Sequence, residues 1–186
     1  MTTVISMLRG VNVGGHNKIK MDELRAVYAS LGLQDPQTYV QSGNVVFRTE
    51  ARDLVPLATK IEKAIERKFG FRPDVILRTT SDLRDVIAKN PFAARRGIDP
   101  RKLVITFLPV DPGPEARDKV LKMKPDPEEV RFDGRELYIY FPDGMGRSKL
   151  VPALGKALKN AGTARNWNTV TKLLEIAERL EAKNAG

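Results

Sequence analysis

The chain has 186 residues, of which 41% are apolar and 30% are charged, a composition that indicates a folded protein and excludes a disordered chain. It holds 32 basic and 23 acidic residues, so its formal net charge is +9, which fits either a polyanionic partner or simple solubility. It has no cysteine, no basic segment followed by a long apolar stretch at its start, and no apolar run near the roughly 20 residues of a membrane-spanning helix, so we expect a cytoplasmic protein without disulfides or a membrane partner.

The first half of the chain shows the periodicity of strands and helices in the order β-α-β-β-α-β. Apolar and β-branched runs predict four strands, at residues 3–8, 38–41, 45–48 and 74–78. Apolar residues at helical spacing predict one helix that ends at Gly32 and another that ends at Gly70. This order is that of the ferredoxin-like unit.

The second half nearly repeats this order after a connecting helix that begins at Ser81 and ends at Asn90 and Pro91. Three strands are expected, at residues 103–108, 130–132 and 136–141, and three helices, at residues 114–123, 154–161 and 170–180. No eighth strand is evident before the last helix. We therefore expect an α+β fold of two ferredoxin-like subdomains in tandem, residues 1–92 and residues 93–186, the second lacking a clear last strand and ending in a helix.

A loop rich in glycine and asparagine, residues 9–18, follows the first strand. Such a loop frees the backbone to approach a ligand, and flanking cations together with the next helix N-terminus favour an anion. The spacing matches neither a P-loop nor a dinucleotide-binding fingerprint, and the alternative is a loop that only turns a strand into a helix. The candidate ligand-binding residues here are Arg9, Asn12, Gly14, Gly15, Asn17 and Lys18.

Ser42 and Asn44 belong to a tight turn between the second and third strands. In the expected topology the first and second strands run in the same direction, so this turn should emerge at the same sheet edge as the glycine loop. Small polar side chains there either orient a ligand or simply close the turn. We predict that the loop and the turn lie side by side and form one composite site.

Two further stretches precede helices in the second half. In residues 141–149, Ser148 and Lys149 follow two glycines, which suggests a phosphate cradle or only a helix cap. In residues 163–169, Arg165 and Asn166 are candidate ligand-binding residues, whereas the tryptophan at 167 is expected in the core and Asn168 or Thr169 as the helix cap.

The sequence contains few of the residue combinations that form conventional catalytic sites. His16 is the only histidine, so a histidine-rich metal site is impossible and a histidine-based triad would depend on this exposed loop residue. No close pair of carboxylates accompanies the glycine-rich loops. We expect no cofactor and no metal, and the sequence assigns no catalytic residue.

Five motifs resemble those of the bacterial "domain of unknown function 1697" family. They are RGVNVGGHNKIKM at residues 9–21, TYVQSGNVVF at residues 38–47, NPF at residues 90–92, GRSK at residues 146–149 and TARNWNT at residues 163–169. The resemblance implies a fold of two ferredoxin-like subdomains. It implies no reaction, substrate or cofactor, because the family is named for lacking one.

The sequence favours binding of a small phosphorylated or carboxylated ligand at the glycine loop, the turn and the Arg165 segment. One alternative is nucleic-acid binding, which would need exposed aromatic residues on the sheet, and Tyr138, Tyr140 and Phe141 are the only cluster. A second alternative is an interaction protein without a small ligand. A deep polar pocket, a broad basic face and a flat apolar patch would separate the three.

Overall fold

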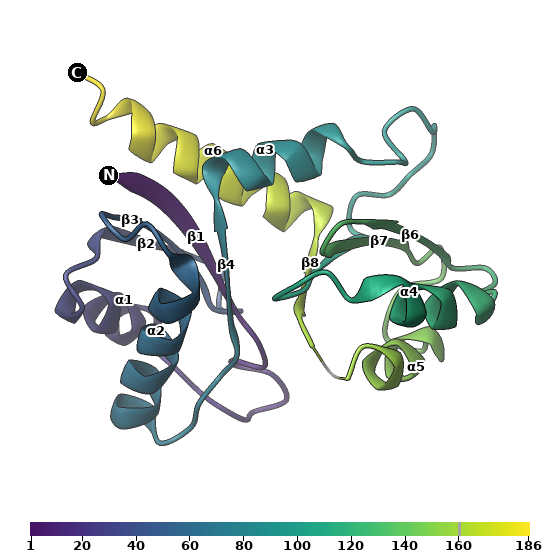
Figure 1. Ribbon diagram of the computed structural model, residues 1–186, viewed down its shortest axis with the longest axis horizontal. Helices are drawn as coiled ribbons and strands as arrows, with labels where there is room; N and C mark the ends of the chain where they lie inside the picture. The colour runs from purple at the N-terminus through teal and green to yellow at the C-terminus, as the bar shows by residue number, and fades with distance from the viewer. Residues whose placement is uncertain (160) are drawn as a thin grey trace. The chain divides into compact units, whose positions relative to one another are not determined.

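The computed structural model describes residues 1–159 and 161–186 (Figure 1). Strands and helices are interspersed along the described chain. In chain order they are β1 (Thr2–Leu8), α1 (Met21–Ser30), β2 (Gln34–Tyr39), β3 (Asn44–Thr49), α2 (Leu54–Phe69), β4 (Val75–Thr79), α3 (Thr80–Ala88), β5 (Leu103–Phe107), α4 (Gly113–Lys122), β6 (Glu129–Asp133), β7 (Glu136–Tyr140), α5 (Leu150–Ala157), β8 (Thr163–Asn166) and α6 (Trp167–Ala182). The expected α+β class is confirmed.

The first sheet is antiparallel, with strand order β2-β3-β1-β4. Strand β1 lies inside the sheet because its apolar run is buried from Thr3 to Leu8. Strand β2 is an edge strand, longer at its start than the predicted residues 38–41, and it tolerates Pro36 because an edge needs fewer ladder donors. Because β1 and β2 are both antiparallel to β3, the ends of β1 and β2 meet at one edge.

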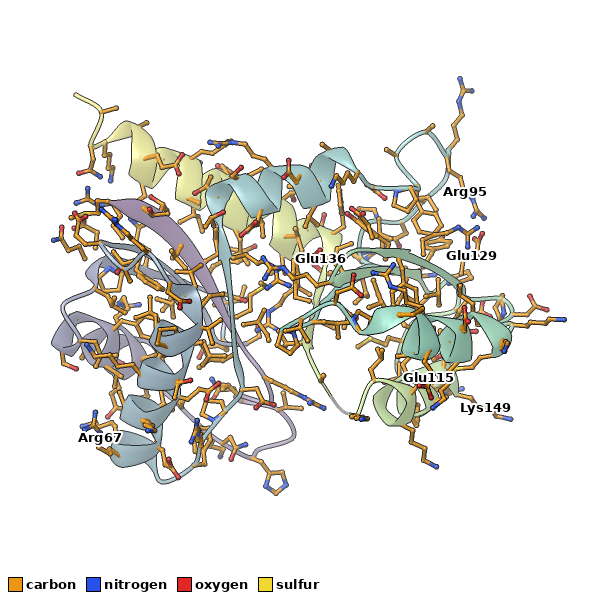
Figure 2. The ribbon with its side chains drawn as sticks, viewed as in Figure 1. Arg67, Arg95, Glu115, Glu129, Glu136 and Lys149 are labelled. Atoms are coloured by element: carbon orange, nitrogen blue, oxygen red, sulfur yellow. The ribbon has the colours of Figure 1, made fainter. Side chains whose placement is uncertain are left out.

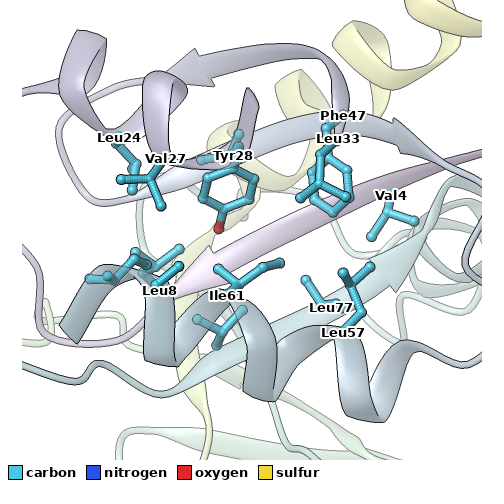
Figure 3. Close-up of a cluster of buried hydrophobic side chains, with 14 of the residues drawn as sticks. Val4, Leu8, Leu24, Val27, Tyr28, Leu33, Phe47, Leu57, Ile61 and Leu77 are labelled. Atoms are coloured by element: carbon cyan, nitrogen blue, oxygen red, sulfur yellow. The ribbon is translucent and has the colours of Figure 1, made fainter. Parts of the chain in front are cut away.

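The core of the first sheet lies between its strands and helices α1 and α2 (Figure 3). Helix α1 contributes Leu24 and Val27, and α2 contributes Leu57 and Ile61, at the spacing that puts apolar side chains on one helical face. The Tyr28 ring packs edge-on against Phe47, with centroids 5.4 Å apart. These helices thus hold the sheet from one side and leave the loops at its edge exposed.

The second sheet is also antiparallel, with order β6-β7-β5-β8. The expectation that the second half lacks a last strand is wrong, because β8 pairs with β5 and sets Arg165 opposite Ile105. The segment Thr163–Asn166 has no apolar alternation, so its sequence does not show the strand. Apolar residues from α4 and α5, among them Val120, Leu150 and Leu154, pack against this sheet.

Backbone contacts divide the described chain into two compact units. The first unit comprises residues 1–84 together with residues 172–186, and the second comprises residues 85–171. The first boundary between these contact units falls after residue 84, and the last part of α6 groups with the first unit, while the division into subdomains at residues 92 and 93 stays a prediction. The longest helices, α2 and α6, have 16 residues each, and none of the helices described is long and apolar enough to cross a membrane.

Candidate functional site

The glycine loop of the first unit is folded into a small hairpin. Gly14 and Gly15 form its tip with φ angles of +58° and +77°, and the backbone N–H of His16 donates to the carbonyl of Val13 at 3.0 Å. Positive φ at both central residues is typical of a type I′ turn, which strongly favours glycine. The two glycines are therefore explained by the turn before any ligand is invoked.

The side chain of Asn12 fastens this loop at its base. Its Nδ2 donates to the carbonyl oxygens of Ile19 (3.0 Å) and Gln41 (2.7 Å), and its Oδ1 accepts from the backbone N–H of Ile19 (2.8 Å). The Nδ2 of Asn17 donates to the carbonyl of Gly10 at 3.2 Å. Both carboxamides, predicted as ligand-binding groups, are thus used to shape the loop.

The turn between β2 and β3 lies directly beside the loop, as predicted from the strand order. The Asn12–Gln41 bond joins the two, and the backbone N–H of Leu8 donates to the carbonyl of Gly43 at 2.9 Å. A Cβ at position 43 would lie 2.9 Å from the Cβ of Leu8, so glycine is required there. Asn44 is buried, and its Nδ2 donates to the carbonyl of Tyr39 and to Ser42 Oγ, each at 3.0 Å.

An open groove of about 480 Å³ lies between the loop, the turn and the start of α1. Its lining comprises Asn12, Gly15, Lys18, Ile19, Lys20, Glu23 and Gln41. Lys18 and Lys20 are exposed, and neither forms an ion pair with a residue that the structure describes. By contrast, Arg9 lies 3.8 Å from the carboxylate of Asp74.

The electrostatics of the groove are mixed. Lys18 and Lys20 supply positive charge, and α1 begins directly after Lys20 with no side-chain cap, so the positive end of its dipole adds to theirs. The Glu23 carboxylate opposes them, and the backbone N–H of Glu23 donates to the Asp22 carboxylate at 3.0 Å. The lining therefore has a small positive excess.

Sequence reasoning missed Lys20, Glu23 and Gln41 as groove residues. The signal was present for two of them. Gln41 borders the turn that the strand order brings to the loop, and Lys20 continues the basic flank that begins at Lys18. Glu23 gives no such signal, because an acid in the first turn of a helix is favourable without any ligand.

The stretch before α5 places Ser148 at the helix start. Its Oγ accepts from the backbone N–H of Leu150 (3.1 Å) and donates to the Glu128 carboxylate (2.6 Å), so Ser148 caps the helix. Lys149 extends from the ribbon into solvent (Figure 2). The adjoining groove, about 620 Å³, is lined by three cations and three carboxylates, namely Lys124, Arg147, Lys149, Asp126, Glu128 and Asp143. Such a balanced lining does not select an anion.

The third predicted stretch contains β8 and the start of α6. Arg165 is buried, and its guanidinium donates to Thr163 Oγ1 at 2.8 Å and to the carbonyl of Ala164 at 2.9 Å. Burial lowers the pKa of Arg165 to about 10. The carboxamide oxygen of Asn166 accepts from the backbone N–H of Thr169 at 2.9 Å, so Asn166 is a cap of α6, a role predicted for Asn168 or Thr169. That Arg165 and Asn166 share the site with the loop stays a prediction.

The aromatic residues considered for base stacking are buried in the second unit. Tyr138 and Phe141 are each 1% exposed and Tyr140 is 9% exposed. The hydroxyl of Tyr138 donates to the carbonyl of Val86 at 2.6 Å, and the ring of Phe92 packs against Tyr140 with centroids 6.2 Å apart. These rings therefore present no open platform for nucleobases.

Among the residues that the structure describes, no group of three histidine or acidic side chains lies close enough to hold a metal ion. His16 is exposed at the flank of the loop tip. Nothing in its described surroundings orients the imidazole as a general base.

Comparison with known proteins shows the family and the fold. A model of the family described as "Protein of unknown function (DUF1697)" matches residues 1–138, so the motifs at residues 146–149 and 163–169 lie outside the matched part. No curated protein matches the chain. A solved structure of the conserved bacterial protein SP0830 from Streptococcus pneumoniae is similar, with a TM-score of 0.69 and 21% identity over 95% of this chain and 98% of that one, a likeness that concerns the fold alone. The protein belongs to the DUF1697 family of unknown function.

Proposed function

We propose that the groove beside the glycine loop binds a small anionic ligand, phosphorylated or carboxylated, through the ammonium groups of Lys18 and Lys20. The observation that carries the proposal is the pair of exposed lysines without a described acidic partner, both lining one groove. Ammonium groups bind phosphate and carboxylate oxygens through charge-assisted hydrogen bonds. Asn12 and Asn17 contribute to binding indirectly, because their side chains hold the loop in its folded conformation.

The balance of charge in the groove limits the ligand. Two ammonium groups face one carboxylate, Glu23, which disfavours a ligand with several anionic groups. The carboxamide of Gln41 offers both a donor and an acceptor to the rest of the molecule. We therefore propose a ligand with one phosphate or carboxylate group and neutral polar atoms beside it.

Nucleic-acid binding and a purely structural interaction role remain the alternatives. The rings of Tyr138 and Tyr140 are buried, so they do not supply the exposed aromatic residues that nucleic-acid binding by the sheet would need, and the small-ligand proposal ranks first. As part of the same proposal, we assign a ferredoxin-like fold to each unit, which the strand order of its sheet supports. We also assign the protein to the bacterial cytoplasm, which its lack of cysteine supports.

Thermal unfolding in increasing inorganic phosphate tests the proposal, because a ligand that binds only the folded state raises the melting temperature. We expect Lys18→Ala and Lys20→Ala each to weaken phosphate binding about tenfold, as loss of one charge-assisted bond implies. Lys60→Ala and Lys63→Ala, on the exposed face of α2, are the matched controls and should leave the shift unchanged. Equal shifts in all four variants would show that phosphate binds elsewhere or only through bulk charge.

A parallel titration with a labelled oligonucleotide at two salt concentrations addresses the main alternative. Binding to a phosphate backbone falls steeply with salt and is spread over many cations. Tight, salt-sensitive oligonucleotide binding that Lys18→Ala leaves intact, with no response to phosphate, would favour nucleic acid over the small ligand.

A further inference from the structure

The backbone at Val40, in the turn next to the groove, is unusual for its residue type. Its φ is +51°, in the left-handed region that β-branched residues avoid because their Cβ substituents crowd the backbone. The side chain is 48% exposed, so burial in a core does not explain it. The conformation is costly and needs another reason.

Val40 differs in residue type from the neighbouring positions that have the same left-handed backbone conformation. The glycine loop and the turn contain six other residues with positive φ, and every one is glycine or asparagine: Gly10, Asn12, Gly14, Gly15, Asn17 and Gly43. Those are the residue types that the left-handed region accepts at little cost. At position 40 the chain has an apolar, branched side chain where asparagine would relieve the strain.

A second exposed valine lies on the other side of the same junction. Val13 is 62% exposed and precedes the glycine tip of the loop. The bond from Asn12 Nδ2 to the carbonyl of Gln41 ties the two segments together, and Val13 and Val40 each adjoin one member of that bonded pair. Two exposed valines are therefore chain neighbours of Asn12 and Gln41, which line the groove.

We infer that the ligand of this groove carries an apolar substituent next to its anionic group, with Val13 and Val40 contacting the substituent while Lys18 and Lys20 hold the anion. The inference rests on the proposed function and specifies its ligand class. Removing the exposed valine surface from water supplies a reason for apolar side chains at these positions. The ligand class is an organic phosphate or carboxylate with a hydrophobic portion.

Isothermal titration with two matched pairs of probes tests the inference: inorganic phosphate against phenyl phosphate, and acetate against benzoate. We expect the ring to raise the affinity of the wild-type protein about tenfold, as burial of one ring face against two valines implies. Val40→Asn should remove most of that advantage and leave the affinity for phosphate or acetate unchanged. The same variant should melt at a higher temperature without ligand, because asparagine fits the left-handed backbone.

The control is Val110→Asn, an exposed valine (68%) in the second unit, which should change neither the ring's advantage nor the affinity for the small anions. If phosphate or acetate binds in a Lys18-dependent way but the ring adds nothing, the inference is overturned and the proposed function stands. If neither member of either pair binds, or binding ignores Lys18 and Lys20, both fail. A ring advantage that persists in Val40→Asn and in Val13→Asn also overturns the inference.

Discussion

Ser6 and Tyr28 form a polar pair inside the apolar core of the first unit. Their hydroxyl oxygens are 2.7 Å apart, and both residues are 0% exposed. Each hydroxyl is the other's partner, which is how a buried polar group avoids the cost of lost hydration. Burial also raises the pKa of Tyr28 far above its ordinary value, more than the bond from Ser6 lowers it.

We expect Tyr28→Phe to lower the free energy of unfolding by about 1–2 kcal/mol, because it leaves the Ser6 hydroxyl buried without this partner. The double variant Ser6→Ala, Tyr28→Phe should recover part of that loss, since it removes both hydroxyls. Urea unfolding of the wild type, the two single variants Ser6→Ala and Tyr28→Phe, and the double variant measures the coupling between the two side chains. Strictly additive losses would mean that the bond contributes nothing.

Stability should fall as pH rises above about 10, the ordinary pKa of tyrosine. Above that pH the unfolded chain loses the Tyr28 proton while the folded protein keeps it, so the unfolded state binds fewer protons and deprotonation favours unfolding. The expected slope is about 1.4 kcal/mol per pH unit for this residue. Urea unfolding between pH 9 and about 11 should give a shallower decline for Tyr28→Phe, in which Tyr138, with its own raised pKa, still contributes. Parallel declines would contradict this account.

At the scale of elements, two glycines in the second unit should differ in how much stability they lose on substitution by alanine. Gly162, just before β8, has φ of +87°, and a Cβ there would lie 2.4 Å from the carbonyl oxygen of Phe107. Gly162→Ala should therefore destabilise the protein by more than about 2 kcal/mol. Gly146 has no such φ and nothing within 4 Å, so Gly146→Ala should lie within about 0.5 kcal/mol of wild type. Thermal unfolding compares the pair, and similar losses would refute the distinction.

Much of the fold could be predicted from elements with a strong apolar pattern. β1 is a buried apolar run and α2 has apolar residues at helical spacing, so both were identified. β8 and the start of β2 were missed because their short polar sequences gain strand structure only from pairing with β5 and β3.

The position of the candidate site could be predicted from the sequence as well, but the role of each residue in it could not. Strand direction alone brought the loop and the turn together. Asn12 holds the loop through its side-chain hydrogen bonds, and Lys20 lines the groove because α1 begins directly after it. Neither role can be read from the type of the residue alone.

At the scale of the whole molecule, the excess of positive charge is divided almost equally between the two units. The first unit contains 16 basic and 12 acidic residues, and the second contains 16 and 11. Many exposed arginines are paired, for example Arg84 with Glu178 and Glu181. The net charge of +9 therefore does not by itself mark one unit as a polyanion-binding module.

Residues 172–186, which include the last part of α6, should be necessary for the first unit. Leu173 and Ala177 are fully buried and Leu180 is 2% exposed. We expect Leu180→Ala to cost about 2–5 kcal/mol, as for other buried leucines. Hydrogen exchange should then show reduced protection in residues 1–84, whereas Lys183→Ala, at an exposed position, should change little. Loss of protection confined to residues 85–171 would contradict the assignment of this segment.

The division of the first unit between the two ends of the chain has a consequence for its synthesis. A ribosome makes residues 1–84 before residues 85–171, and residues 172–186 after them, so the first unit has its complete sequence only once its last segment has been made. The second unit is continuous, and all its residues have been made before that moment. The unit that is begun first is thus the last to have all its residues. While the nascent chain grows, the surface that its last helical segment covers in the folded unit is uncovered.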